Sequence, residues 1–158
     1  MKRNLLKSIV VLALVVSVFA MNAPVLVSGQ DGGGRLEGTW NVQVTLRNCQ
    51  TGAQIRTFPS LTTFVAGGTT FDSTSSIPQA QKTPGHGVWN HVGGNIYRFS
   101  FKSFNPGGIF TGWTKIAHEA TLGSNAAEYT STGTAELYNA SGTLFLTGCS
   151  TTTATRFE

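Results

Sequence analysis

Apolar and polar side chains alternate strictly from Trp40 to Arg47, in the order Trp-Asn-Val-Gln-Val-Thr-Leu-Arg. A period of two residues is typical of a β-strand with one buried face. The even-numbered residues are therefore expected to point inward. Gly38 lets the backbone bend as it enters this stretch. We predict a first strand over about residues 38–47.

No later stretch shows the 3.6-residue period of a helix bounded by caps, whereas turn signals recur at short spacing. This pattern favours an all-β barrel or sandwich. We expect a meander of eight antiparallel strands, with no helix after the last, that closes into a single up-and-down barrel when the first and last strands pair. The predicted strands cover about residues 38–47, 60–66, 69–74, 86–92, 95–104, 109–122, 127–138 and 143–157.

Side-chain direction follows from the turns. Two-residue hairpin turns at Gly67-Gly68 and Gly93-Gly94 suit the positive φ angles of such turns, and they give one consistent inner face around the barrel. Its expected members are Trp40, Val42, Val44, Leu46, Phe64, Phe71, Val88, Phe99, Phe101, Ile116, Leu137, Leu144 and Leu146. The same alternation places Asp72 on the outer face and pairs Trp89 with Arg98 there. A sandwich shows the same alternation, so closure depends on how the chain ends pair.

The first twenty residues have the features of a signal peptide: a basic start, a short apolar core, and small residues before the cut after Ala20. A second cleavage site lies after Gly29. The alternative is a membrane anchor, for which the apolar run is short. We expect a flexible leader over residues 21–36, the barrel over 37–158, secretion to the extracellular space or periplasm, and no stable membrane anchor after cleavage.

Two cysteines in an exported chain predict one disulfide, between Cys49 and Cys149. Placing them opposite each other pairs the first and last strands antiparallel. This pairing brings Arg156 within a residue or two of Trp40. The bridge would tie together two strands that no hairpin joins.

Charge excludes one class of partner. The full chain carries 11 basic and 7 acidic residues. Removal of Lys2, Arg3 and Lys7 with the signal leaves 11 − 3 = 8 basic residues and a net charge of +1. With no basic run, nucleic-acid binding is not expected. We also expect no cofactor and no metal site, and glycosylation at Asn139 only in a eukaryotic source.

Gly38-Thr39-Trp40 on the first strand, the eight-strand meander, and Arg156 near the end of the last strand resemble the calycin superfamily, which includes lipocalins and avidins. The resemblance implies that Trp40 packs at a closed end of the barrel with Arg156 across it, a favourable cation–π contact. The Thr-Asp-Tyr motif of lipocalins is replaced by residues 123–126, Gly-Ser-Asn-Ala, and avidin's biotin contacts are not matched. Allene oxide cyclase and dirigent barrels are also similar in strand number.

We expect a secreted, lipocalin-like protein that binds a small, mostly apolar molecule. The mouth should lie at the end that carries the loops 50–59 and 75–84, with His86 as a polar contact. The candidate ligand-binding residues are Leu46, Phe64, His86, Phe99, Phe101, Leu137 and Leu144.

Two alternatives stay open. A cyclase or isomerase would use His118, which is expected to face Ser131, or His86 as a general base. The competing interpretation of His118 is a satisfied polar cluster in the core. The second alternative is a surface or self-associating protein with a filled barrel, in which an outward Trp113 contacts a second subunit. An open cavity would distinguish ligand binding from a filled barrel.

Overall fold

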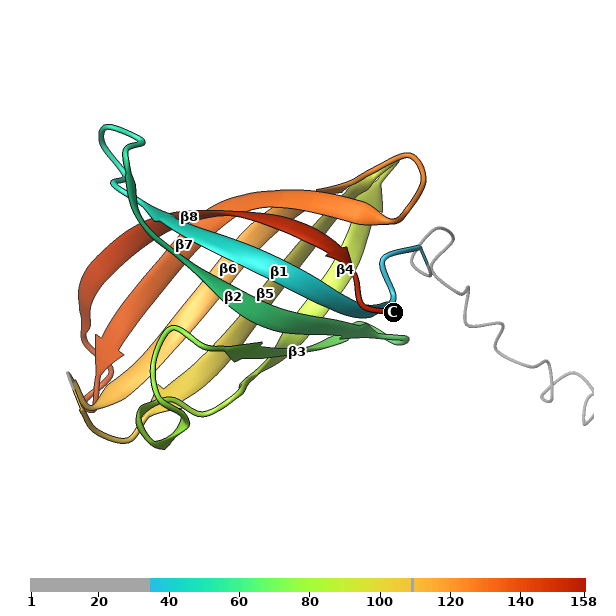
Figure 1. Ribbon diagram of the computed structural model, residues 1–158. Coiled ribbons are helices and arrows are strands. Elements are labelled where there is room, and N and C mark those ends of the chain that lie inside the picture. The colour runs from blue at the N-terminus through green and yellow to red at the C-terminus, as the bar shows by residue number, and fades with distance from the viewer. Residues whose placement is uncertain (1–34, 109) are drawn as a thin grey trace, which may run out of the picture.

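The computed structural model describes residues 35–108 and 110–158, which form one closed antiparallel barrel in up-and-down order (Figure 1). The predicted all-β barrel is confirmed. The predicted signal peptide lies outside the described residues. The elements are β1 (Gly38–Arg47), β2 (Gln54–Val65), β3 (Thr69–Thr74), a short 3-10 helix (Gln79–Gln81), β4 (Gly85–Gly93), β5 (Ile96–Asn105), β6 (Gly112–Leu122), β7 (Glu128–Asn139) and β8 (Leu144–Arg156).

Pairing of β1 with β8 closes the barrel, and Trp40 lies opposite Arg156. The predicted disulfide between Cys49 and Cys149 is present, with a Cα–Cα distance of 5.1 Å. Cys149 is paired with Arg47 rather than with Cys49, so the register differs from the prediction by two residues. An even difference leaves every side chain on its predicted face. The bridge therefore joins Cys149 to a residue just beyond the end of β1.

Strands β3 and β4 have the opposite orientation to the one predicted. Phe71 and Val88 are exposed, whereas Asp72 and Trp89 are buried. His86 lies on the outer face, where its ring contacts that of Phe71 at 5.1 Å between centroids. The predicted inward positions of these side chains, and the predicted outer pair of Trp89 and Arg98, are therefore wrong.

The cause is one extra residue in the turn between β2 and β3, and a bulge near the end of β4. Val65 pairs with Thr69, so Ala66, Gly67 and Gly68 form a three-residue connection instead of a two-residue turn. Gly67 and Gly68 have φ angles of 87° and 91°, a region that favours glycine. In the next hairpin the register shifts between His91 and Gly93. An odd change in register moves each side chain to the other face.

Most of the other predicted faces are confirmed, although registers differ. Phe99 is buried and pairs with His118 instead of Thr114. Strand β2 begins at Gln54, so the expected loop 50–59 is largely strand. Leu144 and Leu146, predicted to point inward, are about half exposed near the start of β8.

One end of the barrel is closed by the residues that carried the calycin resemblance. The Cζ atom of Arg156 lies 4.5 Å from the centre of the Trp40 ring. Its guanidinium donates hydrogen bonds to three backbone oxygens, those of residues 35, 37 and 126. The Trp40 indole donates to the carbonyl of Leu36, which is fully buried. The chain therefore forms an eight-stranded barrel that is compatible with a calycin-like fold.

Candidate functional site

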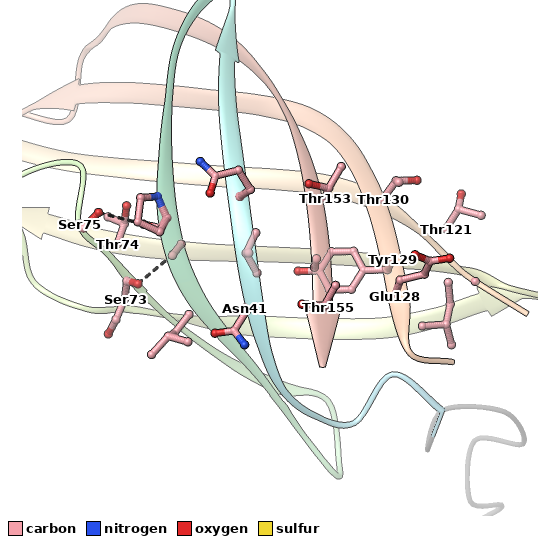
Figure 2. A pocket seen from close by; sticks show the side chains of 18 of the residues that line it. Asn41, Ser73, Thr74, Ser75, Thr121, Glu128, Tyr129, Thr130, Thr153 and Thr155 are labelled. Atoms are coloured by element: carbon pink, nitrogen blue, oxygen red, sulfur yellow. Dashed lines mark hydrogen bonds between the residues drawn. The ribbon is translucent and has the colours of Figure 1, made fainter. Parts of the chain in front are cut away.

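Two hollows of different character lie on the two sides of the sheet. The larger, about 860 Å³, is on the outside (Figure 2). It is lined largely by exposed polar side chains of neighbouring strands, such as Asn41 on β1, Thr153 on β8 and Thr130 on β7. The smaller, about 180 Å³, is the interior of the barrel. Only the interior hollow is surrounded by inward-facing side chains, so we treat it as the candidate site.

The wall of the interior cavity is mostly apolar. Phe99 and Phe101 lie with their rings parallel on β5, and Val44 and Ile116 approach from other strands. Toward the mouth, Ile77 and Phe110 come from the connecting loops. The apolar lining residues are Val42, Val44, Leu46, Phe58, Ile77, Phe99, Phe101, Phe110, Ile116, Ala135 and Leu137.

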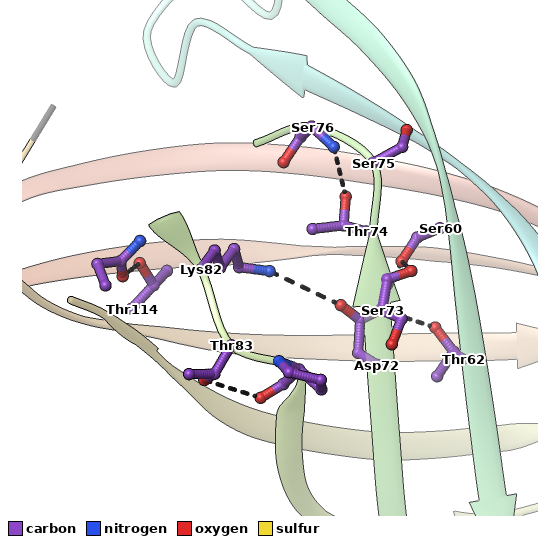
Figure 3. Close-up of polar contacts among 12 residues, drawn as sticks. Ser60, Thr62, Asp72, Ser73, Thr74, Ser75, Ser76, Lys82, Thr83 and Thr114 are labelled. Carbon is purple, nitrogen blue, oxygen red and sulfur yellow. Dashed lines mark hydrogen bonds and ion pairs between the residues drawn. The ribbon is translucent and has the colours of Figure 1, made fainter. Parts of the chain in front are cut away.

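A buried ion pair projects into this wall (Figure 3). The Lys82 ammonium lies 4.0 Å from a carboxylate oxygen of Asp72, and the two side chains are only 11% and 7% exposed. The other Asp72 oxygen accepts hydrogen bonds from Ser60 at 2.7 Å and Thr62 at 3.1 Å. Asp72 therefore accepts two hydrogen bonds and faces one ammonium, whereas among the described residues the Lys82 ammonium has one distant partner for its three donors.

The loop that carries Lys82 is held in place at the barrel mouth. Thr83 exchanges two hydrogen bonds with the backbone of Phe104, both at 2.9 Å. The Asn105 side chain donates to the carbonyl of Gln81. These contacts on both sides of Lys82 fix its backbone against the end of β5, and the side chain reaches from there into the barrel (Figure 3).

Burial shifts both members of the pair toward their neutral forms. Desolvation raises the pKa of Asp72 above its usual range, and the nearby ammonium and the two hydroxyls only partly oppose this shift. Desolvation likewise lowers the pKa of Lys82, against the opposing effect of the Asp72 charge. Lys82 therefore loses its proton more readily than a lysine on the surface.

His118 lies on another part of the cavity wall. Its Nδ1 is 2.7 Å from the Ser131 hydroxyl and its Nε2 is 2.8 Å from the Ser150 hydroxyl. Burial lowers the pKa of His118 to about 4, so the imidazole is neutral near pH 7. Because both ring nitrogens are occupied by hydroxyls, neither is free for a ligand. This arrangement fits a satisfied polar cluster.

The hydroxyl of Tyr129 is the least satisfied polar group of the cavity. It is buried and has no hydrogen bond of acceptable geometry within the described residues. Thr62 and Asp72 are close enough to influence its pKa, which burial raises. The Thr62 hydroxyl donates its hydrogen to Asp72. The Tyr129 hydroxyl is thus enclosed by neighbouring side chains and is not exposed to the cavity.

The structure brings together four of the seven expected ligand-binding residues: Leu46, Phe99, Phe101 and Leu137 line the cavity. Phe64 is buried in the core at the closed end, against Tyr129 and Trp89. His86 is on the outer face and Leu144 is half exposed, and neither lines the cavity.

Sequence reasoning missed the ion pair. Lys82 lies in a polar loop without any period, and Asp72 is next to Phe71, which a hydrophobic pattern places inside. One signal was present. Thr70, Asp72 and Thr74 lie on one face of this strand, and Phe71 lies on the other. The strand therefore has to bury either three polar side chains or the face that carries the phenylalanine.

The described part of the chain contains no cluster of three metal-ligating side chains and no helix with the length and hydropathy of a membrane span. Trp113 faces outward as predicted, but its ring stacks on Tyr138 at 3.7 Å, and the Lys102 ammonium lies 4.1 Å from its centre. Its aromatic surface is therefore largely occupied by neighbours in the same chain.

Comparison with known proteins adds no relative from which a function could be transferred. No family model, no curated protein and no solved structure matches this chain. The similarity to calycins consequently rests on the closed eight-stranded barrel and on the contact between Trp40 and Arg156.

Proposed function

We propose that this protein binds a small, mostly apolar molecule inside its barrel, in the manner of lipocalin-like proteins. The observation that carries the proposal is the unfilled interior of about 180 Å³, with an apolar wall and a few convergent polar groups. Binding sites for small molecules commonly combine these features. A filled barrel would leave no room for a guest.

The volume restricts the size of the guest. An apolar cavity of about 150 Å³ holds benzene. By the same scale, this cavity suits a molecule of about six to ten non-hydrogen atoms. A single substituted ring or a short chain fits, whereas a long fatty acid or a polycyclic ligand does not. The Lys82 side chain favours a guest with one acceptor atom.

Secretion is part of the same proposal. The disulfide between Cys49 and Cys149 supports it, because such bridges persist in oxidising compartments and are rare in the cytosol. The protein would then meet its ligand outside the cell or in the periplasm.

The test is calorimetric titration with toluene, a guest of suitable size. Val44→Phe enlarges a side chain that lines the cavity. We expect it to weaken toluene binding at least about tenfold, since the phenylalanine ring would occupy the space that the toluene ring needs. Val88→Phe makes the same chemical change on the outer face, where Val88 is 63% exposed. It should leave the affinity unchanged. Equal binding by both variants, or no binding by the wild type, would contradict the proposal.

Self-association has one observation in its favour. Leu61, Val65, Phe71 and Val88 are exposed on the outer faces of β2, β3 and β4. Exposed apolar patches often mark contact surfaces. Sedimentation velocity on the wild type and on Phe71→Ser would test this second candidate. We expect any dimer to be lost in the variant.

A further inference from the structure

We propose that Lys82 captures small aldehydes in the barrel cavity as a covalent imine, with Asp72 as its proton partner. The proposal deepens the proposed function and rests on it, because the aldehyde must first occupy the same cavity. It would make the protein a carrier or scavenger of reactive carbonyl compounds.

Three lysines lie in the described part of the chain, and only one of them lines the cavity. Lys102 covers the Trp113 ring on the outer face. Lys115 pairs with Glu136 and is 48% exposed. Lys82 is 11% exposed and its ammonium lies 4.0 Å from Asp72. The barrel thus presents one enclosed amine to a guest and two solvated amines that serve as internal controls.

Imine formation requires the neutral amine, because an ammonium has no lone pair. Lysines that act as nucleophiles are typically desolvated in apolar pockets. Here burial favours the neutral amine, and the buried carboxyl of Asp72 is able to take the proton. The same pair stores that proton within the cavity, where the next steps need it.

The chemistry balances without any redox partner. The Lys82 nitrogen attacks the carbonyl carbon, a C–N bond forms, and the carbonyl oxygen becomes a hydroxyl by taking the proton held by Asp72. Loss of that hydroxyl as water, with a second proton from the nitrogen, leaves a protonated C=N bond beside the Asp72 carboxylate. Return of the last nitrogen proton to Asp72 gives the neutral imine. The net change is one aldehyde and one amine converted to one imine and one water. A protonated imine would keep Asp72 as its counterion.

The rest of the cavity suits an aldehyde with an apolar body. The Phe99 and Phe101 rings provide an apolar wall. A carboxylate guest is less suitable, because it would bring a charge into a buried and mostly apolar site. A neutral guest adds no charge.

The experiment treats the full chain with benzaldehyde and sodium cyanoborohydride at pH 7, followed by peptide mapping. Reduction converts an imine into a stable benzylamine, which adds one benzyl group to the lysine. Each unit by which the pKa of an amine is lowered raises its neutral fraction at pH 7 about tenfold. We therefore expect Lys82 to carry most of the label, ahead of Lys102 and Lys115. Label distributed according to exposure would overturn the proposal.

Two variants complete the test. Lys82→Arg keeps the positive charge beside Asp72 but has no amine that forms an imine, so the cavity label should disappear. Lys115→Arg makes the same change on the surface and should leave that label intact. If toluene binds but benzaldehyde leaves no label on Lys82, the imine proposal fails while the binding function stands. If toluene does not bind, both fail.

Discussion

At the closed end of the barrel the interior is filled by aromatic and aliphatic side chains, whereas toward the mouth it holds an ion pair, several hydroxyls and empty space. At the closed end, the Trp40 ring packs against Tyr129 at 4.9 Å between centroids and under Arg156. Near the mouth, Lys82 enters from a loop and meets Asp72 beside a cavity of about 180 Å³.

This difference indicates that the closed end contributes mainly to stability and that the mouth half is the better candidate for function. A buried ion pair is weak evidence for stability, because the cost of desolvating two charges often exceeds their attraction. Apolar packing at the closed end carries no such cost. Natural proteins depart from consistent packing mainly at functional sites. The mouth half, where the departures gather, is therefore where we place ligand binding.

The largest effect on stability is expected for Trp40→Ala at the closed end. Removing a large buried aromatic side chain typically costs about 3–5 kcal/mol of the free energy of unfolding. It would also remove the support of the Arg156 guanidinium. Urea unfolding monitored by circular dichroism measures the change. Val88→Ala on the exposed outer face is the control and should cost no more than about 0.5 kcal/mol. Similar losses in both variants would contradict the assignment of the closed end as the stabilising region.

The second prediction concerns pH. His118 has a folded-state pKa of about 4, below its ordinary value of 6.5. Between these pH values His118 is protonated in the unfolded chain but neutral in the folded protein. The free energy of unfolding therefore falls as the pH falls from 6.5 to about 4. The shift corresponds to about 3 kcal/mol. Above pH 6.5 the contribution is complete and constant.

His118→Gln separates this effect from that of Asp72, whose raised pKa acts in the opposite direction. Glutamine does not titrate, so the variant should lack most of the decline between pH 6.5 and 4. Urea unfolding at several pH values gives both curves. Parallel curves would mean that His118 is not held neutral by the fold.

The same two regions show how far sequence reasoning reaches. The closed end could be predicted because Trp40 and Val42 alternate with polar residues and Arg156 stands at a matching distance from the other chain end. Register errors of two or four residues did no harm there, since an even shift keeps each side chain on its face.

The mouth half could be predicted only in part. A Gly-Gly pair does not reveal whether the residue before it belongs to the turn, and Ala66 does. That single residue moves Asp72 from the surface to the interior and Phe71 in the opposite direction. The hydrophobic pattern favours Phe71 inside, and the strand overrides this preference by burying Asp72 with hydrogen bonds from Ser60 and Thr62. The position of Lys82 could not be predicted for a different reason: loop residues show no periodicity that indicates which side chains are buried.

Binding inside the barrel can be observed residue by residue in a toluene titration followed by methyl NMR. We expect saturable shifts of the methyl signals of Val44, Ile116 and Leu137, whose side chains line the interior. The methyl signals of Val88 and Leu61, which are exposed on the outer face, should not move. Shifts confined to the outer methyl groups, or none at saturating toluene, would contradict the claim that the barrel interior is the binding site.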